Sequence, residues 1–447
     1  MSEIEQVIAK LRDAGIHRVK LAATDIDGVL RGKYISLEKF ASAANGLGFC
    51  DVIFGWDIGD ALYDNCRYTG WHTGYPDAQA RIDLSSLRTI PWEPGTAFFL
   101  MDLLTAQGEP LSISPRQVLQ SVLEKAKQSG FSAKVAAEYE FWLFRETPHS
   151  LREKNFQHLT PLSPGMFGYS VLRASQNAPL VLDLIDQLAG FDVALEGFHT
   201  ETGPGVYEAA ICVDDALRAA DKAVLFKTAV KEIAARHGVL PTFMAKWSAD
   251  LPGSSGHLHQ SLCCASGDTN LFFENGGMSP LMRQYIAGLG AFIPELMIMI
   301  APTVNSYKRT VPGTWAPINA SWGTDNRTTA IRAIMGSSKS TRIELRLSAA
   351  DMNPYLAIAA SLAAGLEGVE QKLDPPPPVM NGYEAKGCSS LPRDLGEAAM
   401  QFNQSAIARK WFGDSFVDHF VGTREWELRQ YRRAVTDWEL ARYFESV

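Results

Sequence analysis

The segment KVAAEYEFWLF, residues 134–144, alternates apolar and acidic side chains, which is the pattern of a β-strand with one buried face. One face carries Val135, Ala137, Tyr139 and Phe141, and the opposite face carries Glu138 and Glu140. The two carboxylates lie side by side among large apolar residues, and they repel each other unless a cation neutralises them. This segment therefore predicts a strand that contributes to a cation site.

Two further segments repeat this alternation. GHLHQSL, residues 256–262, places His257, His259 and Ser261 on one face, and RIELRL, residues 342–347, does the same with Arg342, Glu344 and Arg346. Each pattern alone also fits a strand of an antiparallel sheet with one solvated face. Together with Glu138 and Glu140, the three strands favour a metal site built across a sheet.

A fourth segment, HTETGPGVYE, brackets a Thr-Gly-Pro-Gly turn with Glu201 and Glu208. Such a turn can bring both carboxylates to one point, although the segment also fits an exposed acidic loop. Several carboxylates with one or two imidazoles and no thiolate suit Mg2+ or Mn2+ rather than structural zinc. Arginines that could bind phosphate or carboxylate groups follow along the chain: Arg309, Arg327, Arg332, Arg342 and Arg346. Metals, carboxylates and arginines together predict phosphoryl transfer.

Composition excludes several other classes of function. The chain has 447 residues, of which 46% are hydrophobic and 21% charged, as in a folded globular protein. The net charge of -8 and the lack of a Lys/Arg run argue against nucleic acid or an anionic membrane as a partner. The acidic start does not resemble a secretory signal, and the apolar segment 288–302 is too short to span a bilayer. Six cysteines without a C-x-x-C pair predict a reducing, cytoplasmic location.

The chain divides into two regions of different character. Residues 1–110 are rich in short strands, after a helix capped by Ser2 and Glu5 and a hairpin turning at Asp27-Gly28. Residues 111–447 contain longer helical patterns, so we predict a domain boundary near residue 110. Helices are expected at 115–130, with Ser114 as its cap, and at 214–237, 280–300, 354–370 and 424–444, and an irregular surface connection at 374–396.

The order of motifs in the second region is distinctive. E-Y-E, E-x6-E, GSSGHLHQS, NSYKR, DNRTTAIR, RIELR and NPYLAIAA follow one another between residues 138 and 360. This set resembles the glutamine synthetase family. The resemblance implies an α+β fold, with a small N-terminal β-grasp-like domain and a large catalytic domain whose antiparallel half-barrel sheet is flanked by helices.

The resemblance also assigns roles to individual residues. Glu140, Glu201 and Glu208 would hold one metal ion, and Glu138, His257 and Glu344 would hold a second. Positions lining the nucleotide are matched by His259, Ser261, Lys339 and Arg342, and positions holding glutamate by Gly253, Arg309 and Arg346. Arg327 and Arg332 match the residues that contact the transferring phosphate.

The reaction implied has two steps, with ATP as a substrate and two or three Mg2+ or Mn2+ ions per site. The γ-carboxylate of glutamate attacks the γ-phosphate of ATP, and an amine then displaces phosphate from γ-glutamyl phosphate. Members of the family form rings of six or twelve subunits, and the N-terminal domain of one subunit completes the active site of the next.

The chain departs from ammonia-using members at the loop that follows NSYKR. That loop reads Val311-Pro312-Gly313-Thr314-Trp315, and Trp315 stands where those members have a glutamate that accepts a proton from the nucleophile. Pro252 replaces an asparagine before Gly253, and Phe54-Gly55-Trp56-Asp57 replaces the run that reaches the neighbouring site. We therefore expect a ligase that joins glutamate to a larger amine.

Four tryptophans could form a wall for an apolar amine, and Asp57 or Asp60 could meet the far ammonium of a diamine. The tryptophans are Trp56, Trp71, Trp315 and Trp322. Two alternatives remain open from the sequence: a glutamine synthetase that uses ammonia with another base, and a non-catalytic homologue that acts as a structural or sensor protein.

Overall fold

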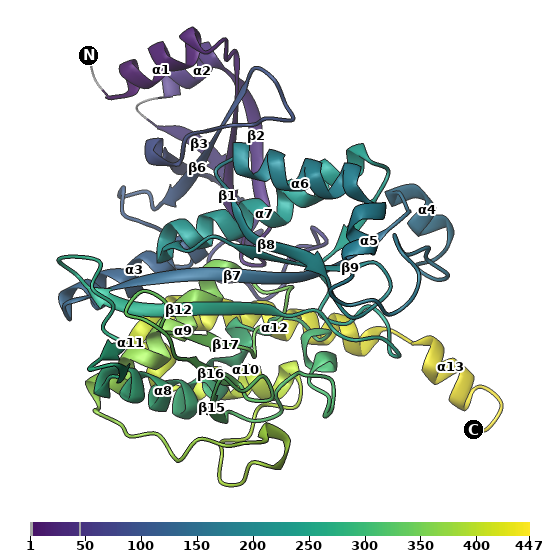
Figure 1. Ribbon diagram of the computed structural model, residues 1–447. Helices are drawn as coiled ribbons and strands as arrows, with labels where there is room; N and C mark the ends of the chain where they lie inside the picture. The colour runs from purple at the N-terminus through teal and green to yellow at the C-terminus, as the bar shows by residue number, and fades with distance from the viewer. Residues whose placement is uncertain (1–2, 44–45) are drawn as a thin grey trace.

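The computed structural model describes residues 3–43 and 46–447, and it contains two sheets, each with its own layer of helices (Figure 1). The first sheet has the strand order β2-β1-β6-β4-β3, with β5 paired to β6. The elements of this region are α1 (Glu3–Asp13), β1 (Arg18–Thr24), β2 (Leu30–Ser36), α2 (Leu37–Ser42), β3 (Leu47–Cys50), η2 (Asp51–Phe54), β4 (Asp77–Ile82), η3 (Leu84–Ser86), β5 (Arg88–Thr89) and β6 (Thr96–Leu104).

The second sheet is larger and has the order β15-β16-β17-β12-β7-β9-β8, while β10 and β11 also pair with β7. Its strands are β7 (Phe131–Phe144), β8 (Leu195–Thr200), β9 (Val206–Ile211), β10 (Asp214–Asp215), β11 (Leu240–Thr242), β12 (Gly256–Cys264), β15 (Trp322–Thr324), β16 (Ile331–Ile334) and β17 (Arg342–Leu345). A separate hairpin pairs β13 (Phe273–Glu274) with β14 (Gly277–Met278). The sheet curls into a half-barrel, as the expected α+β architecture requires.

Helices cover this sheet and fill the spaces beside it. They are α3 (Pro115–Gln128), α4 (Pro148–Glu153), α5 (Val171–Gln176), α6 (Ala178–Gly190), α7 (Ala216–Arg236), α8 (Pro280–Phe292), η4 (Ile293–Met299), η5 (Ser306–Arg309), α9 (Pro354–Glu370), η6 (Gly382–Glu384), α10 (Leu395–Gln404), α11 (Ala406–Phe412), α12 (Asp414–Arg433) and α13 (Asp437–Tyr443). None of the helices in the described ranges combines the length and the apolar character needed to cross a bilayer.

Several predictions of secondary structure are confirmed. The hairpin of β1 and β2 turns at Gly28, whose φ of 83° is the left-handed conformation that glycine adopts without strain. The helices expected at 115–130, 214–237 and 354–370 correspond to α3, α7 and α9. Ser114 occupies the N-cap of α3, but its side chain makes no capping hydrogen bond. The capping box predicted for Ser2 lies outside the described residues.

Two helix predictions were wrong in their limits. The helix expected at 280–300 ends at Phe292 and continues as the 3-10 helix η4, because Pro294 has no N–H to donate. The helix expected at 424–444 begins ten residues earlier, at Asp414, and is broken after Arg433. Thr436 then caps α13, with a reciprocal bond from Glu439.

The boundary predicted near residue 110 stays a prediction, and charged groups cross it at several places. Arg116 of α3 donates to Asp83 at 2.6 Å and Asp102 at 3.0 Å, both in the first region, and to Asp221 of α7 at 2.9 Å. Asp102, Asp221 and Arg116 are all buried. One guanidinium therefore joins three carboxylates from both sides of the boundary.

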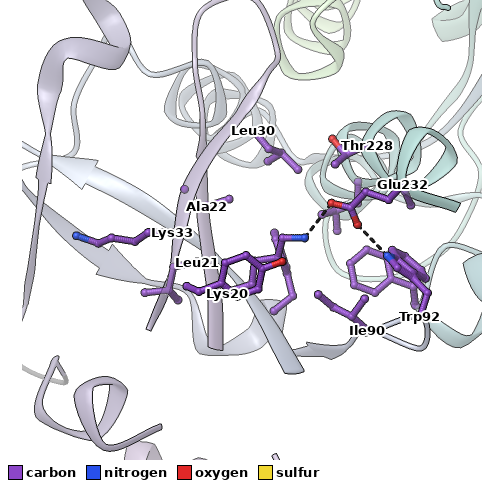
Figure 2. Close-up of a pocket in the computed structure, with 15 residues that line it drawn as sticks. Lys20, Leu21, Ala22, Leu30, Lys33, Ile90, Trp92, Thr228 and Glu232 are labelled. Atoms are coloured by element: carbon purple, nitrogen blue, oxygen red, sulfur yellow. Dashed lines mark hydrogen bonds and ion pairs between the residues drawn. The ribbon is translucent and has the colours of Figure 1, made fainter. Parts of the chain in front are cut away.

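The hairpin β1–β2 faces α7 across a small cavity (Figure 2). Lys20 contacts Glu232 of α7 at 2.8 Å and Glu93 at 3.0 Å, while the Trp92 indole N–H donates to Glu232 at 2.8 Å. The cavity has a volume of about 200 Å³ and a largely apolar lining that includes Phe98 and Phe191. The polar side chains of Lys20, Glu93, Glu232 and Trp92 therefore join the two regions, and apolar side chains line the cavity beside them.

Replacing Arg116 tests the importance of this network. Arg116→Ala leaves Asp102 and Asp221 buried without their cation, which costs about 3 kcal/mol or more and should lower the midpoint of thermal unfolding by at least about 6 °C. Differential scanning calorimetry provides the measurement. Arg393→Ala, which removes a surface pair with Glu397, is the matched control and should change the midpoint little. Equal midpoints for the two variants would contradict this view of Arg116.

Candidate functional site

Strand β7 lies at the centre of the site because it pairs with β12 on one side and β9 on the other. The register places His257 of β12 opposite Glu138, and Glu208 of β9 opposite Glu140. On the far side of β12, His259 pairs with Glu344 of β17. Strand pairing therefore brings the polar faces of the predicted strands together on one surface of the sheet.

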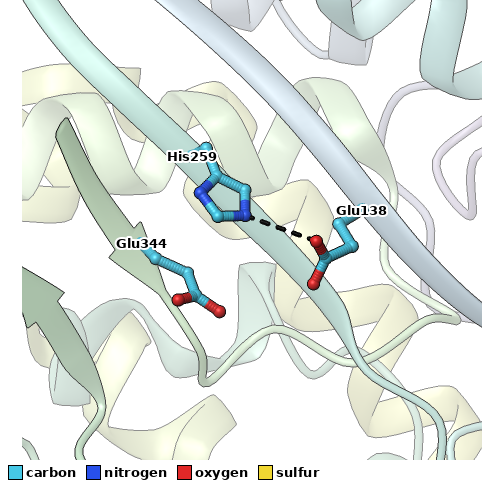
Figure 3. A group of neighbouring side chains, drawn as sticks. All are labelled: Glu138, His259 and Glu344. Atoms are coloured by element: carbon cyan, nitrogen blue, oxygen red, sulfur yellow. Dashed lines mark ion pairs between the residues drawn. The ribbon is translucent and has the colours of Figure 1, made fainter. Parts of the chain in front are cut away.

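Glu138, His259 and Glu344 form the first cluster (Figure 3), and each presents a possible ligand atom within 4.8 Å of the others. His259 Nε2 lies 3.6 Å from Glu138. His257 Nδ1 lies 3.0 Å from Glu138 and 3.3 Å from Glu344, so this second imidazole contacts the same two carboxylates. The three residues predicted for one metal ion, Glu138, His257 and Glu344, therefore lie together beside His259.

Positive groups surround the carboxylates of the first cluster. Burial opposes ionisation of Glu138, but contacts with His257 and His259 hold its pKa well below the usual range. Burial likewise opposes ionisation of Glu344, and the charges of His257 and Arg346 bring its pKa to about 2. Arg332 donates to Glu344 at 3.0 Å, and Arg346 also donates to this carboxylate. Both carboxylates are therefore ionised at neutral pH.

His199, Glu201 and Glu208 form the second cluster at the hairpin of β8 and β9. The Thr-Gly-Pro-Gly turn brings Glu201 and Glu208 together, as its sequence suggested, and His199 lies between them. His199 Nε2 is 2.9 Å from Glu208, and Nδ1 is 3.8 Å from Glu201. Burial lowers the pKa of His199, but the contact with Glu208 raises it to about 9.

The sequence argument missed His199, although a usable signal was present. His199 lies in β8 and Glu201 directly follows the end of that strand, so the spacing of two residues is the same as that of His257 and His259. Tyr169 was missed as well, since it lies outside any strand. Its ring stacks on His199 with the centroids 4.5 Å apart, so it forms an aromatic wall beside the second cluster.

The charge of the second cluster fits a cation. Burial raises the pKa of Glu208, and the negative charges of Glu138 and Glu140 raise it further. Glu140 accepts a hydrogen bond from the Ser255 N–H at 2.8 Å, which fixes the orientation of its carboxylate. Oxygen-rich donors with uncompensated negative charge form the set that hard divalent cations prefer, so the residues present fit the metal that the sequence predicts.

The residues predicted for glutamate binding lie together. A Cβ on Gly253 would come within 2.8 Å of the Arg309 side chain and within 2.7 Å of the Ala245 carbonyl, so only glycine fits here. Arg309 donates to the carbonyls of Arg346 at 3.1 Å and Leu347 at 3.2 Å. Burial lowers the pKa of Arg309 to about 10, which still leaves it charged at neutral pH.

The remaining predicted residues lie around the first cluster or along its strands. Arg342 donates to His259 Nδ1 at 3.2 Å, which leaves Nε2 to face Glu138. Ser261 lies on β12, two residues beyond His259, and Lys339 lies in the loop before β17. Arg332 pairs with Glu344 in the sheet. Arg327 is exposed in the loop between β15 and β16, without a hydrogen bond or ion pair in the part of the chain that is described.

Asp57 is not joined to either cluster within the chain. Its carboxylate accepts hydrogen bonds from the N–H groups of Gly59 at 2.8 Å and Ala61 at 3.0 Å, and from the Trp426 indole at 2.9 Å. Asp60 is paired with Arg31 at 2.7 Å. Both aspartates therefore have structural partners in the first region.

The four tryptophans differ in their environments. Trp322 is buried, and its indole donates to the Pro376 carbonyl at 2.7 Å, so it is a packing residue and no wall for a substrate. Trp56 packs under the guanidinium of Arg31. Trp71 and Trp315 are exposed, and Trp315 has a φ of 60° that is unusual for an aromatic residue.

Comparisons with known proteins agree with this arrangement. The family model for the glutamine synthetase catalytic domain matches residues 112–443. Type-1 glutamine synthetase 2 of Dictyostelium discoideum is 50% identical over 96% of this chain and 84% of its own length. Glutamate–isopropylamine ligase of a Pseudomonas species is 41% identical over 100% of this chain and 99% of its own.

A solved structure of GmaS in complex with ADP superposes on this chain with a TM-score of 0.84. It is 28% identical in sequence, and the superposition covers 98% of this chain and 99% of that one. The likeness therefore extends over both sheets. From the family match, the full-length relatives and the arrangement of the two clusters, we conclude that this chain belongs to the glutamine synthetase family.

Proposed function

We propose that this protein is an ATP-dependent ligase that joins the γ-carboxylate of glutamate to an organic amine. The observation that carries the proposal is the flap, residues 311–315, which has no side chain able to accept a proton and presents an exposed Trp315. A protonated ammonium ion gains no carboxylate partner from such a flap. A larger amine, in contrast, gains apolar contact with the indole.

The two clusters have separate roles in this proposal. Glu140, Glu201 and Glu208 would hold one Mg2+ or Mn2+ ion, and Glu138, His257 and Glu344 would hold the other, with ATP as the nucleotide. A divalent ion held by these residues would supply positive charge for the phosphate oxygens. The specific ion, the number of ions and a ring-shaped assembly of six or twelve subunits all belong to the proposal.

The side chains of the protein orient the reactants. Arg309 and Arg346, beside Gly253, would bind the carboxylates of glutamate, and Arg327 and Arg332 would stabilise the charge that spreads over the transferring phosphate. His259, Ser261, Lys339 and Arg342 would line the nucleotide. Displacement of phosphate by the amine breaks the acyl–phosphate C–O bond and forms the amide C–N bond, and the amine nitrogen loses a proton to solvent.

A glutamine synthetase that uses ammonia is the second candidate, because the relative at 50% identity bears that name. The isopropylamine ligase, at 41% identity, covers both chains almost entirely. The comparisons therefore leave the amine open, and the proposal depends on the chemistry of the flap.

The first prediction concerns the metal ligands. Glu140→Ala removes a carboxylate that the Ser255 N–H orients, and it should abolish phosphate release with every amine while the thermal midpoint changes little. Titration with Mn2+ followed by electron paramagnetic resonance should show fewer bound ions. Glu153→Ala, at an exposed position on α4, is the control. Near-normal turnover by Glu140→Ala at modest Mg2+ would show that the metal assignment is wrong.

The second prediction concerns the choice of amine. The kcat/KM for the best organic amine should exceed that for ammonia by at least about tenfold, because each buried methylene contributes about 0.8 kcal/mol. Steady-state phosphate release should be measured at fixed pH with ammonium chloride, isopropylamine, ethanolamine, diamines and aniline.

Substitutions at Trp315 test whether the flap causes the preference for an organic amine over ammonia. Trp315→Glu should reduce the ratio of kcat/KM for the best amine to kcat/KM for ammonia. Trp315→Phe keeps an apolar ring, so this ratio should stay unchanged. If ammonia is the best substrate of the unsubstituted protein, the ligase proposal fails and glutamine synthetase becomes the better assignment.

A further inference from the structure

The connection between α9 and α10, residues 371–394, is tied to the loop that carries Arg327. It has little regular structure, as its Pro and Gly content predicts, but hydrogen bonds hold it firmly in place. Asn326 Nδ2 donates to the carbonyl of Val379 at 2.9 Å, Asn319 Nδ2 donates to that of Gly382 at 2.8 Å, and the Gly382 N–H donates to Thr328 Oγ1 at 2.8 Å. The short helix η6 is therefore fixed against residues 319–328.

This attachment determines the position of Tyr383. A Cβ on Gly382 would come within 2.0 Å of the Thr328 carbonyl, so the backbone before Tyr383 lies directly on that loop. Asn381 accepts a hydrogen bond from the Tyr383 N–H at 3.0 Å and caps η6. Tyr383 thus extends from a rigid support.

The hydroxyl of Tyr383 is buried and has no hydrogen-bond partner within the described residues. Burial raises the pKa of this phenol, while the backbone of Trp315 and Gly313 and the nearby charges of Arg346 and Arg309 lower it. The flap backbone at Gly313 and Trp315 therefore lies close to the phenol. The Nε of Arg346 is also buried and unpartnered.

Two buried polar atoms without a partner, the Tyr383 hydroxyl and Arg346 Nε, indicate a ligand. A buried hydroxyl without a partner is costly, and the cost disappears when a bound group supplies the missing bond. A phenol can donate one hydrogen bond and accept others at the same time. Because the flap backbone and the charges of both arginines act on this phenol, the one hydroxyl can bond to a ligand and to the flap at the same time.

We propose that Tyr383 is a positioning residue that couples glutamate binding to closure of the flap. Its hydroxyl donates to a carboxylate of the glutamate held by Arg309 and Arg346, and its oxygen accepts the flap N–H groups of Gly313 and Trp315. This inference rests on the proposed function, because it requires glutamate at that arginine pair. It adds a residue from outside the sheet to the amino-acid site.

Tyr383→Phe in the full-length protein removes only the oxygen. The KM for glutamate should rise about tenfold, the KM for ATP should stay within about twofold, and the thermal midpoint should not fall. Tyr63→Phe is the matched control, since Tyr63 is also buried with an unpartnered hydroxyl but lies against Trp426. It should leave both KM values unchanged.

Flap closure can be measured without turnover. Chymotrypsin should cleave after the exposed Trp315, and glutamate with a non-hydrolysable ATP analogue should protect this bond in the unsubstituted protein. In Tyr383→Phe the protection should be lost at the same glutamate concentration, and it should return at a glutamate concentration about tenfold higher. Mass spectrometry measures the fragment that ends at Trp315. Cleavage after the exposed Phe156 serves as the internal reference.

Three results would overturn the proposal. The first is an unchanged glutamate KM and unchanged protection in Tyr383→Phe. The second is an equal loss of ATP and glutamate affinity together with a lower midpoint, since that is a structural effect. The third is an absence of glutamate protection in the unsubstituted protein. If glutamate protects but no amine supports phosphate release, the ligase proposal fails while the role of Tyr383 is retained.

Discussion

The pairing of β7 with β12 and β9 is the interaction on which the site depends. It places Glu138 opposite His257 and Glu140 opposite Glu208, and no rotamer change could bring these groups together if the register slipped by one residue. A slip would turn Tyr139 toward the carboxylates of the neighbouring strands. The apolar face of β7 fixes the register, because its side chains are almost completely buried against the large core.

The two clusters differ in how their charge is balanced. In the first, two arginines and two imidazoles surround the carboxylates, so the protein itself supplies most of the neutralisation. In the second, His199 is the one cationic group in contact with Glu201 and Glu208 among the described residues. The second cluster therefore depends more strongly on an added cation. The two clusters are neighbours in the sheet because β7 pairs with β12 on one side and with β9 on the other.

Alternating residues in single strands were sufficient to predict which side chains share a face, and hence most of the candidate site. The family resemblance supplied the α+β fold and the order of the motifs. The alternation within one strand could not indicate which strands are neighbours in the sheet, or in which register they pair. The position of His199 between Glu201 and Glu208 depends on the β8–β9 register. Trp322 was considered as part of a substrate wall because its burial depends on distant packing. Tyr383 was overlooked because it lies in a connection without periodicity.

The buried guanidinium of Arg116 also has a consequence for dissecting the protein. A cut at the boundary predicted near residue 110 would separate Arg116 from Asp83 and Asp102. It would likewise separate Arg424 from Asp27, and Asn353 from the carbonyls of the hairpin turn. Each fragment would then carry buried charges without partners, so neither half is a module that could be exchanged with a relative's. Chimeras within this fold need both sides of these ion pairs from the same parent.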